Sequence, residues 1–139
     1  MIPRFRTLAD AFKATFPPDY CRLVAVREHG DNAIALFDTR PSGHPYLYEV
    51  HYDRTDGEWS EGSSGNAGGW HRLDSDTEVG VVTRWGEAPT GAEAVRGDLE
   101  GRLLEEPVEN GIYLLAWWGV PSGHPAVTHF RMAGRWVAA

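Results

Sequence analysis

The pentapeptide Pro-Ser-Gly-His-Pro occurs twice in this chain, at residues 41–45 and 121–125, and each copy lies inside a longer repeated pattern. An apolar segment precedes each copy, and a segment of alternating apolar and polar residues follows it. Each copy then reaches a Gly-x-Trp sequence, which ends at Trp59 in the first copy and at Trp136 in the second. Because alternation with period two is typical of strands, the pattern predicts a duplicated strand–turn–strand unit over about residues 32–59 and 110–136.

Two interpretations of the pentapeptide remain open. Turn chemistry alone explains the proline, serine and glycine of both copies. In the alternative, His44 and His124 lie on equivalent loops and meet at one end of the molecule, where they contribute to a binding site.

The remainder of the chain predicts about eight to ten short strands behind one N-terminal helix. The helix covers about residues 5–16, with Thr7 in a capping position and Pro17 directly after its end. Residues 20–139 are β-rich. Strand–turn–strand units without long crossovers favour an antiparallel sandwich of the immunoglobulin or fibronectin kind, with a closed antiparallel barrel as the alternative. A chain of 139 residues is expected to form a single domain, 1–139.

Two further segments give specific structural predictions. Residues 112–120 are apolar at successive positions, which predicts a central strand buried on both faces. Residues 60–69 are rich in glycine and serine, which is typical of a mobile loop or a long connection. No Gly-Lys-Ser/Thr ending and no dinucleotide fingerprint accompanies these glycines, so we do not expect phosphate binding there.

The composition argues against several classes of function. Acidic residues outnumber basic ones by 20 to 13, and the net charge of −7 argues against nucleic acid as a partner. The single cysteine, Cys21, allows no internal disulfide and fits a reducing compartment. The first residues lack the apolar run of a signal peptide, and no segment has the length that spans a membrane. We therefore expect a cytoplasmic protein, and the low lysine content indicates a bacterial source.

Aromatic side chains are the first candidates for a binding surface. Tyr46, Tyr48 and Tyr52 alternate along one predicted strand and therefore share a face, which makes them an aromatic surface or a packed face with phenol oxygens at its rim. Trp70 and His71 follow the glycine-rich segment, where they are candidates for a lid over a ligand.

Two adjacent tryptophans have opposite expectations. Side chains of neighbouring strand residues point to opposite faces, so one of Trp117 and Trp118 is expected in the core. The other is expected to line a groove or a partner interface.

The histidines are the candidates for acid–base or metal chemistry. Glu49, His51 and His129 lie on the less apolar faces of their strands, which is typical of a solvated surface. A metal site needs three or four converging ligands, and no known metal motif or Gly-x-Ser-x-Gly sequence is present. We therefore predict no catalytic residue, no metal and no cofactor, and we favour a function without catalysis over an enzyme.

The C-terminal half carries a resemblance to known proteins. Residues 85–89, 113–121 and 134–136 resemble a group of small actinobacterial β-sandwich proteins to which no activity is assigned. The resemblance implies a style of fold and no chemistry.

Three functions follow as hypotheses. The first is a cytoplasmic protein-interaction module that binds a partner protein through an edge strand or an aromatic face. The second is a small-molecule-binding protein, or a barrel enzyme, with an aromatic pocket near the glycine-rich segment. The third is a structural subunit that self-associates through its internal repeat.

Overall fold

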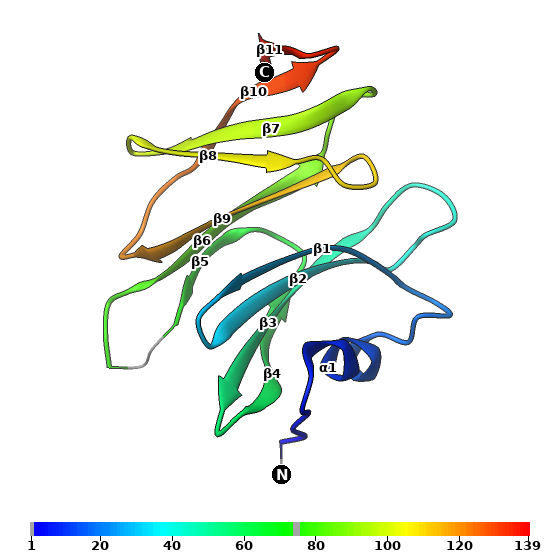
Figure 1. Cartoon of the computed structure of the whole chain (residues 1–139), viewed down its shortest axis with the longest axis vertical. Coiled ribbons are helices and arrows are strands. Elements are labelled where there is room, and N and C mark those ends of the chain that lie inside the picture. The colour runs from blue at the N-terminus through cyan, green and yellow to red at the C-terminus, as the bar shows by residue number, and fades with distance from the viewer. Residues whose placement is uncertain (1, 74–75) are drawn as a thin grey trace. The chain divides into compact units, whose positions relative to one another are not determined.

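The computed structural model describes residues 2–73 and 76–139, which form one short helix, eleven strands and three antiparallel sheets (Figure 1). The predicted mainly-β antiparallel class is confirmed. Because none of these three sheets closes on itself, the barrel alternative is wrong. The chain divides into two compact units, of which unit 1 ends at Ala67 and unit 2 runs from Gly68 to Ala139. No helix in the described part of the chain combines the length and hydrophobicity that crossing a membrane requires.

Unit 1 is a four-stranded sheet in which each strand pairs with the next along the chain. Its elements are α1 (Leu8–Thr15), β1 (Arg22–His29), β2 (Asn32–Asp38), β3 (Leu47–Thr55) and β4 (Glu58–Gly65). Because the order is β1-β2-β3-β4, strands β1 and β4 form the two edges of this sheet.

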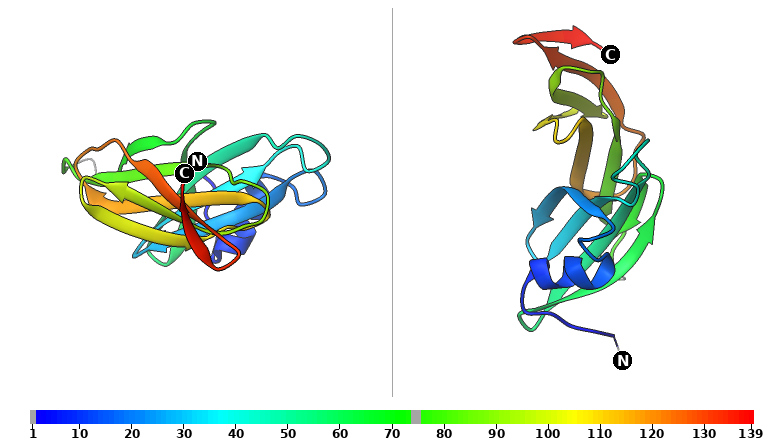
Figure 2. Two further views of the ribbon diagram at one scale, coloured as in Figure 1. Left: turned by 90° about the horizontal axis from the view of Figure 1, so that it is seen from above. Right: turned by 90° about the vertical axis from the view of Figure 1, so that its right-hand side faces the viewer.

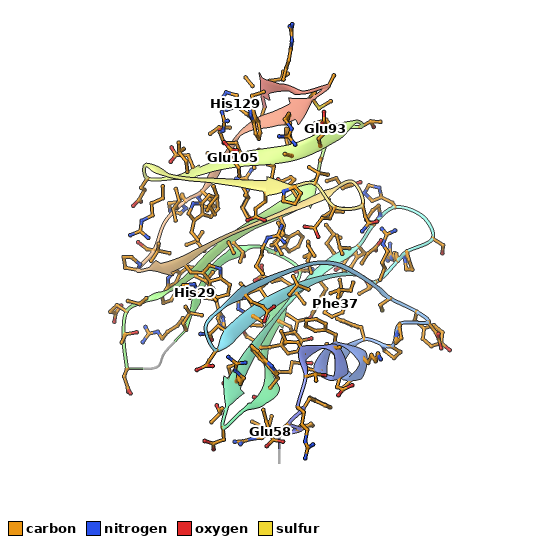
Figure 3. All side chains as sticks on the ribbon, viewed as in Figure 1. His29, Phe37, Glu58, Glu93, Glu105 and His129 are labelled. Atoms are coloured by element: carbon orange, nitrogen blue, oxygen red, sulfur yellow. The ribbon has the colours of Figure 1, made fainter. Side chains whose placement is uncertain are left out.

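The predicted helix is present with narrower bounds. The hydroxyl of Thr7 accepts a hydrogen bond from the backbone N–H of Asp10 at 3.2 Å, as the capping position predicted. Helix α1 lies across one face of the sheet (Figure 2) and brings Phe12 and Phe16 onto it. Both rings meet Phe37 edge-on, at centroid distances of 6.0 Å and 4.9 Å, and Figure 3 shows Phe37 on β2 beside the helix.

One hydrophobic core of unit 1 lies on the helix-facing side of the sheet. Its buried members are Ala11, Ala33, Ala35, Phe37, Val50, Tyr52 and Trp59. Trp59 is tied to the segment before the helix, because its backbone exchanges two hydrogen bonds with Phe5, at 2.8 Å and 2.6 Å. The N-terminal segment is thereby held along the edge strand β4.

Unit 2 is a small antiparallel sandwich, because its two sheets share one apolar core. One sheet has the order β11-β10-β7-β8 and the other has the order β5-β6-β9. The strands are β5 (Gly69–Arg72), β6 (Gly80–Glu87), β7 (Ala92–Leu99), β8 (Arg102–Pro107), β9 (Ile112–Val120), β10 (Ala126–Met132) and β11 (Arg135–Ala138). The shared core joins Val95 and Leu99 of β7 to Leu115 and Trp117 of β9.

The two copies of the repeated pattern agree locally and differ in what they connect. The first Pro-Ser-Gly-His-Pro segment joins β2 to β3, which are hydrogen-bonded neighbours. The second joins β9 to β10, which belong to different sheets of unit 2. The hairpin turns that follow are alike: Asp56 and Gly57 have φ values of 54° and 78°, and Ala133 and Gly134 have 50° and 78°. The turns, the strands and the hairpin that follows each pentapeptide are therefore duplicated, whereas the pairing of the two strands that flank the pentapeptide is not.

Two predictions for individual segments are wrong. Residues 60–65 belong to the edge strand β4 rather than to a mobile loop, because their backbone pairs with β3 although their side chains are small. Strand β9 stands at the end of its hydrogen-bonded order rather than at its centre. Ile112, Leu114 and Leu115 are nonetheless buried, so the apolar run reflects burial on both faces and not a central position.

A single glycine tests the packing of the unit 2 core. A Cβ atom at Gly97 of β7 would lie 2.5 Å from Cδ1 of Leu115 and 2.9 Å from Cη2 of Trp117. We expect Gly97→Ala to lower the free energy of unfolding by about 1–3 kcal/mol, because overpacking forces buried neighbours to move. Urea unfolding followed by tryptophan fluorescence measures the change.

The matched control is Gly65→Ala in β4, where an added Cβ atom meets nothing within 4 Å. This variant should stay within about 0.5 kcal/mol of the wild type. Equal losses in the two variants would contradict the close contact at Gly97.

Candidate functional site

One candidate site is a groove in unit 1, where helix α1 leaves part of the tyrosine face of β3 uncovered. Phe12 packs edge-on against Tyr52 at 5.2 Å, and Phe16 against Tyr48 at 5.8 Å. Beyond these contacts lies a cavity of about 520 Å³, which we call the tyrosine groove. It is lined by Ala14, Thr15, Phe16, Thr39, Tyr46, Tyr48, Val50, Glu61 and Ser64. The predicted aromatic surface is thus partly core and partly the wall of an open groove.

The first Pro-Ser-Gly-His-Pro loop positions Tyr46 at one end of the groove. The buried carboxylate of Asp38 accepts hydrogen bonds from the backbone N–H groups of Arg40 at 2.9 Å and Tyr46 at 3.1 Å. One side chain therefore closes both ends of the loop. The phenol oxygen of Tyr46 accepts a hydrogen bond from Asn66 at 2.9 Å, and the guanidinium of Arg40 lies 5.2 Å from its ring centroid. Three contacts therefore fix Tyr46: a hydrogen bond to its backbone, a hydrogen bond to its phenol oxygen and the guanidinium over its ring.

A short chain of hydrogen bonds forms the other end of the groove. The hydroxyl oxygen of Thr15 lies 2.7 Å from the phenol oxygen of Tyr52 and 2.6 Å from Oε1 of Glu61. Thr15 has one hydrogen to donate, and a carboxylate takes the shorter, charge-assisted bond in preference to the Ala11 carbonyl at 3.0 Å. Tyr52 therefore donates to Thr15, which donates to Glu61. The chain links α1, β3 and β4 through side chains alone.

Tyr52 acts in this chain as a neutral donor. Burial raises the pKa of its phenol from 10.0 to about 12, the nearby Glu61 carboxylate acts in the same direction, and the Thr15 hydrogen bond opposes them. Its proton is therefore retained well above neutral pH, so Tyr52 supplies a hydrogen bond rather than a base.

A second cavity adjoins the groove at Glu61. It measures about 300 Å³ and is lined by Ile2, Pro3, Phe5, Ala14, Thr15 and Glu61. We call it the amino-terminal cavity. Because Ala14, Thr15 and Glu61 line both spaces, the carboxylate of Glu61 stands at their junction.

The predicted site residues are divided between the two units. His44 and His124 are exposed on loops of different units. Trp70 is 37% exposed and packs within unit 2. Its ring covers Gly80, where a Cβ atom would lie 2.6 Å from the indole, and its Nε1 donates to the Val120 carbonyl at 3.0 Å. A role as a lid stays a prediction. His71 follows Trp70, half-buried, in β5.

The two adjacent tryptophans divide as expected. Trp117 lies in the unit 2 core, and its Nε1 donates to the backbone carbonyl of Arg102 at 2.9 Å. Trp118, on the opposite face of β9, is half-buried. A binding role for Trp118 stays a prediction.

One polar pair was missed by the sequence reasoning. Nε2 of His51 lies 2.6 Å from Oε2 of Glu49, and both residues are buried, with exposed fractions of 7% and 6%. The expectation of a solvated face is wrong for these two residues. Alternation along β3 placed them side by side, but nothing in the sequence signalled their burial. They face away from Tyr48 and Val50 and therefore do not belong to the tyrosine groove.

Within the described residues, no three histidine, cysteine, aspartate or glutamate side chains come together in a way that would hold a metal ion.

Comparisons with protein families, with curated proteins and with solved structures find no match to this chain. The resemblance to small actinobacterial proteins therefore stays a hypothesis, and function has to be inferred from geometry.

The raised pKa of Tyr52 predicts a specific loss of stability at high pH. Between about pH 10 and pH 12 an unfolded tyrosine loses its proton while the folded Tyr52 keeps it, so the folded state binds more protons and stability falls as pH rises. Two pKa units correspond to a loss of about 2–3 kcal/mol. The free energy of unfolding in urea, measured from about pH 9 to pH 12, should fall more steeply in the wild type than in Tyr52→Phe.

Tyr52→Phe also loses the hydrogen bond to Thr15, which lowers stability at every pH and shifts the curve without changing its slope. Other groups titrate identically in the two proteins, so the difference in slope isolates Tyr52. Parallel curves would contradict the raised pKa.

Proposed function

We propose that unit 1 binds a small organic molecule in the tyrosine groove. The observation that carries this proposal is the convergence of an aromatic wall, Tyr46 and Tyr48, with the polar side chains of Thr15 and Glu61 around a cavity of about 520 Å³. Ligand sites in proteins typically have volumes of about 300–1,000 Å³, with mostly apolar walls and a few polar groups that fix orientation. The groove has a volume in this range, with aromatic and aliphatic side chains along its wall and several polar side chains around it.

The lining residues favour binding over catalysis. Of the lining residues, Thr15 most resembles a catalytic nucleophile, because its hydroxyl lies beside a carboxylate. That hydroxyl donates a hydrogen bond to Glu61 and accepts one from Tyr52. A phenol that retains its proton cannot serve as the general base that activates such a hydroxyl. We propose that the hydrogen-bonding groups at the polar end of the groove orient a ligand.

The groove is also held rigidly, which favours affinity. One wall is the helix, packed through Phe12 and Phe16, and the other is β3, paired on both sides within the sheet. The loop at Tyr46 is closed by Asp38. Side chains that are already fixed lose little conformational entropy when a ligand binds.

A blocking substitution tests the proposal with indole as a neutral aromatic probe. Ala14 is exposed on α1 and lines the groove, so Ala14→Trp should fill it without disturbing the core. In ¹⁵N–¹H spectra of the wild type, indole should shift the amide signals of Thr15, Tyr46, Tyr48 and Ser64, and in Ala14→Trp these shifts should be lost.

The matched control carries the same substitution on the same helix. Ala9 is also exposed but does not line the tyrosine groove; it lines another groove of about 210 Å³, beside Leu23 of β1. Ala9→Trp should leave the indole shifts in the tyrosine groove unchanged. The proposal fails if indole causes no localised shifts, or if both variants lose them equally.

A second candidate function, protein interaction through an edge strand, is favoured by β11. This four-residue strand forms one edge of its sheet and leaves Val137 49% exposed. The backbone N–H of Ala139 donates to Thr128 of β10 at 2.9 Å, so the N–H of Ala138 points away from the sheet by alternation. Such an edge can accept a strand from a partner protein or from a second copy of the chain.

Removal of the outward donor tests this candidate. Ala138→Pro deletes that N–H, while Ala138→Val keeps it with similar exposure. In affinity capture from the source lysate, followed by mass spectrometry, one stoichiometric protein should accompany the wild type and Ala138→Val and be lost with Ala138→Pro. A co-purifying protein that Ala138→Pro retains would rule out the edge of β11.

A further inference from the structure

We propose that the ligand of the tyrosine groove carries a protonated amine, which binds the Glu61 carboxylate while an apolar body lies along Tyr48 and Val50. This inference rests on the proposed ligand-binding function and names the chemical class of the ligand.

Charge is the first observation that points to a cation. Among the described residues that line the tyrosine groove and the amino-terminal cavity, Glu61 is the only one with a charged side chain. It lines both spaces, so a ligand group at their junction meets this carboxylate from either side. No lysine, arginine or histidine in either lining set is placed to neutralise an anionic ligand. The net charge of −7 adds a general attraction for cations.

Hydrogen-bond direction is the second observation. The Tyr52 hydroxyl donates its hydrogen bond to Thr15, and the Thr15 hydroxyl donates its hydrogen bond to Oε1 of Glu61. Every donor at this end of the groove is therefore directed at a protein acceptor. The other carboxylate oxygen, Oε2, has no hydrogen-bond partner among the residues described. The ligand has to supply a donor here, and an ammonium group has three.

The opposite end of the groove sets the direction of the ligand. The guanidinium of Arg40 does not line the groove, but it lies 5.2 Å from the centroid of the Tyr46 ring and places a positive charge near that end. A ligand ammonium is repelled there and attracted to Glu61. Between the two ends, Tyr48 and Val50 offer an aromatic and aliphatic wall for a flat or aliphatic body.

The expected selectivity is modest because Glu61 is exposed. An exposed ion pair contributes up to about fivefold in affinity, and the contribution falls as salt screens the charges. The discriminating measurement is therefore a comparison of ligands that share one ring and differ in charge.

The experiment uses the full chain and three indole derivatives: tryptamine, which is cationic, tryptophol, which is neutral, and indole-3-propionate, which is anionic. Dissociation constants come from ¹⁵N–¹H titrations at low and at high salt. We expect tryptamine to bind about fivefold more tightly than tryptophol at low salt, and indole-3-propionate to bind more weakly than either.

Two variants with the same change of charge assign the effect to one residue. Glu61→Gln keeps an acceptor for Thr15 and should bind tryptamine no more tightly than tryptophol. Glu58, which Figure 3 labels at the start of β4, lies three residues from Glu61 and therefore on the other face of the strand, outside both lining sets. Glu58→Gln should preserve the wild-type preference.

Each outcome separates this inference from the proposed function. If indole binds in the groove but the three derivatives bind equally, the ligand is not an amine and the groove remains a ligand site. If Glu61→Gln and Glu58→Gln weaken tryptamine equally, general attraction by an acidic protein explains the preference and the assignment to Glu61 is overturned. If no derivative shifts the groove amides, the proposed function itself fails.

Discussion

The packing of α1 across one face of the unit 1 sheet is the contact on which the rest of that unit depends. Phe12 and Phe16 insert edge-on between Phe37, Tyr48 and Tyr52, and this aromatic cluster closes the core. Because the helix has only eight residues, it covers only part of the tyrosine face. The uncovered part is the tyrosine groove. One aromatic cluster therefore fixes both the stability of the unit and the place where a ligand is proposed to bind.

The duplicated pentapeptide illustrates what a local sequence determines and what it does not. In both copies, glycine takes a positive φ, and the later two-residue hairpin turns have nearly identical conformations. Turn chemistry depends on a few neighbouring residues, so it is transferable between the copies. Whether the flanking strands pair with each other depends on residues elsewhere. Strand β2 pairs with β3. In the second copy, β9 pairs with β6 and β10 pairs with β7, so the two strands that flank the pentapeptide do not pair with each other.

The same distinction explains which features the sequence predicted. The capping of α1 by Thr7 and the shared face of the three tyrosines follow from short-range patterns, and both appear in the structure. Tyr46 and Tyr48 line the groove, and Tyr48 and Tyr52 belong to the helix-facing core. The glycine-rich residues of β4 gave no strand signal, because their pairing with β3 comes from the backbone. Burial of Glu49 and His51 likewise has no signature in the alternation of β3.

The polar end of the groove was beyond sequence reasoning for a further reason. Thr15 and Glu61 are separated by 46 positions, and neither belongs to a motif. They meet because the Phe5–Trp59 backbone bridge and the aromatic contacts of α1 place the last turn of the helix against β4. Because the buried Tyr52 keeps its proton, Tyr52 donates to Thr15 and Thr15 donates to Glu61. The chain of hydrogen bonds therefore ends at an exposed carboxylate. The packing of buried side chains thus determines that a ligand at the surface meets a hydrogen-bond acceptor rather than a donor.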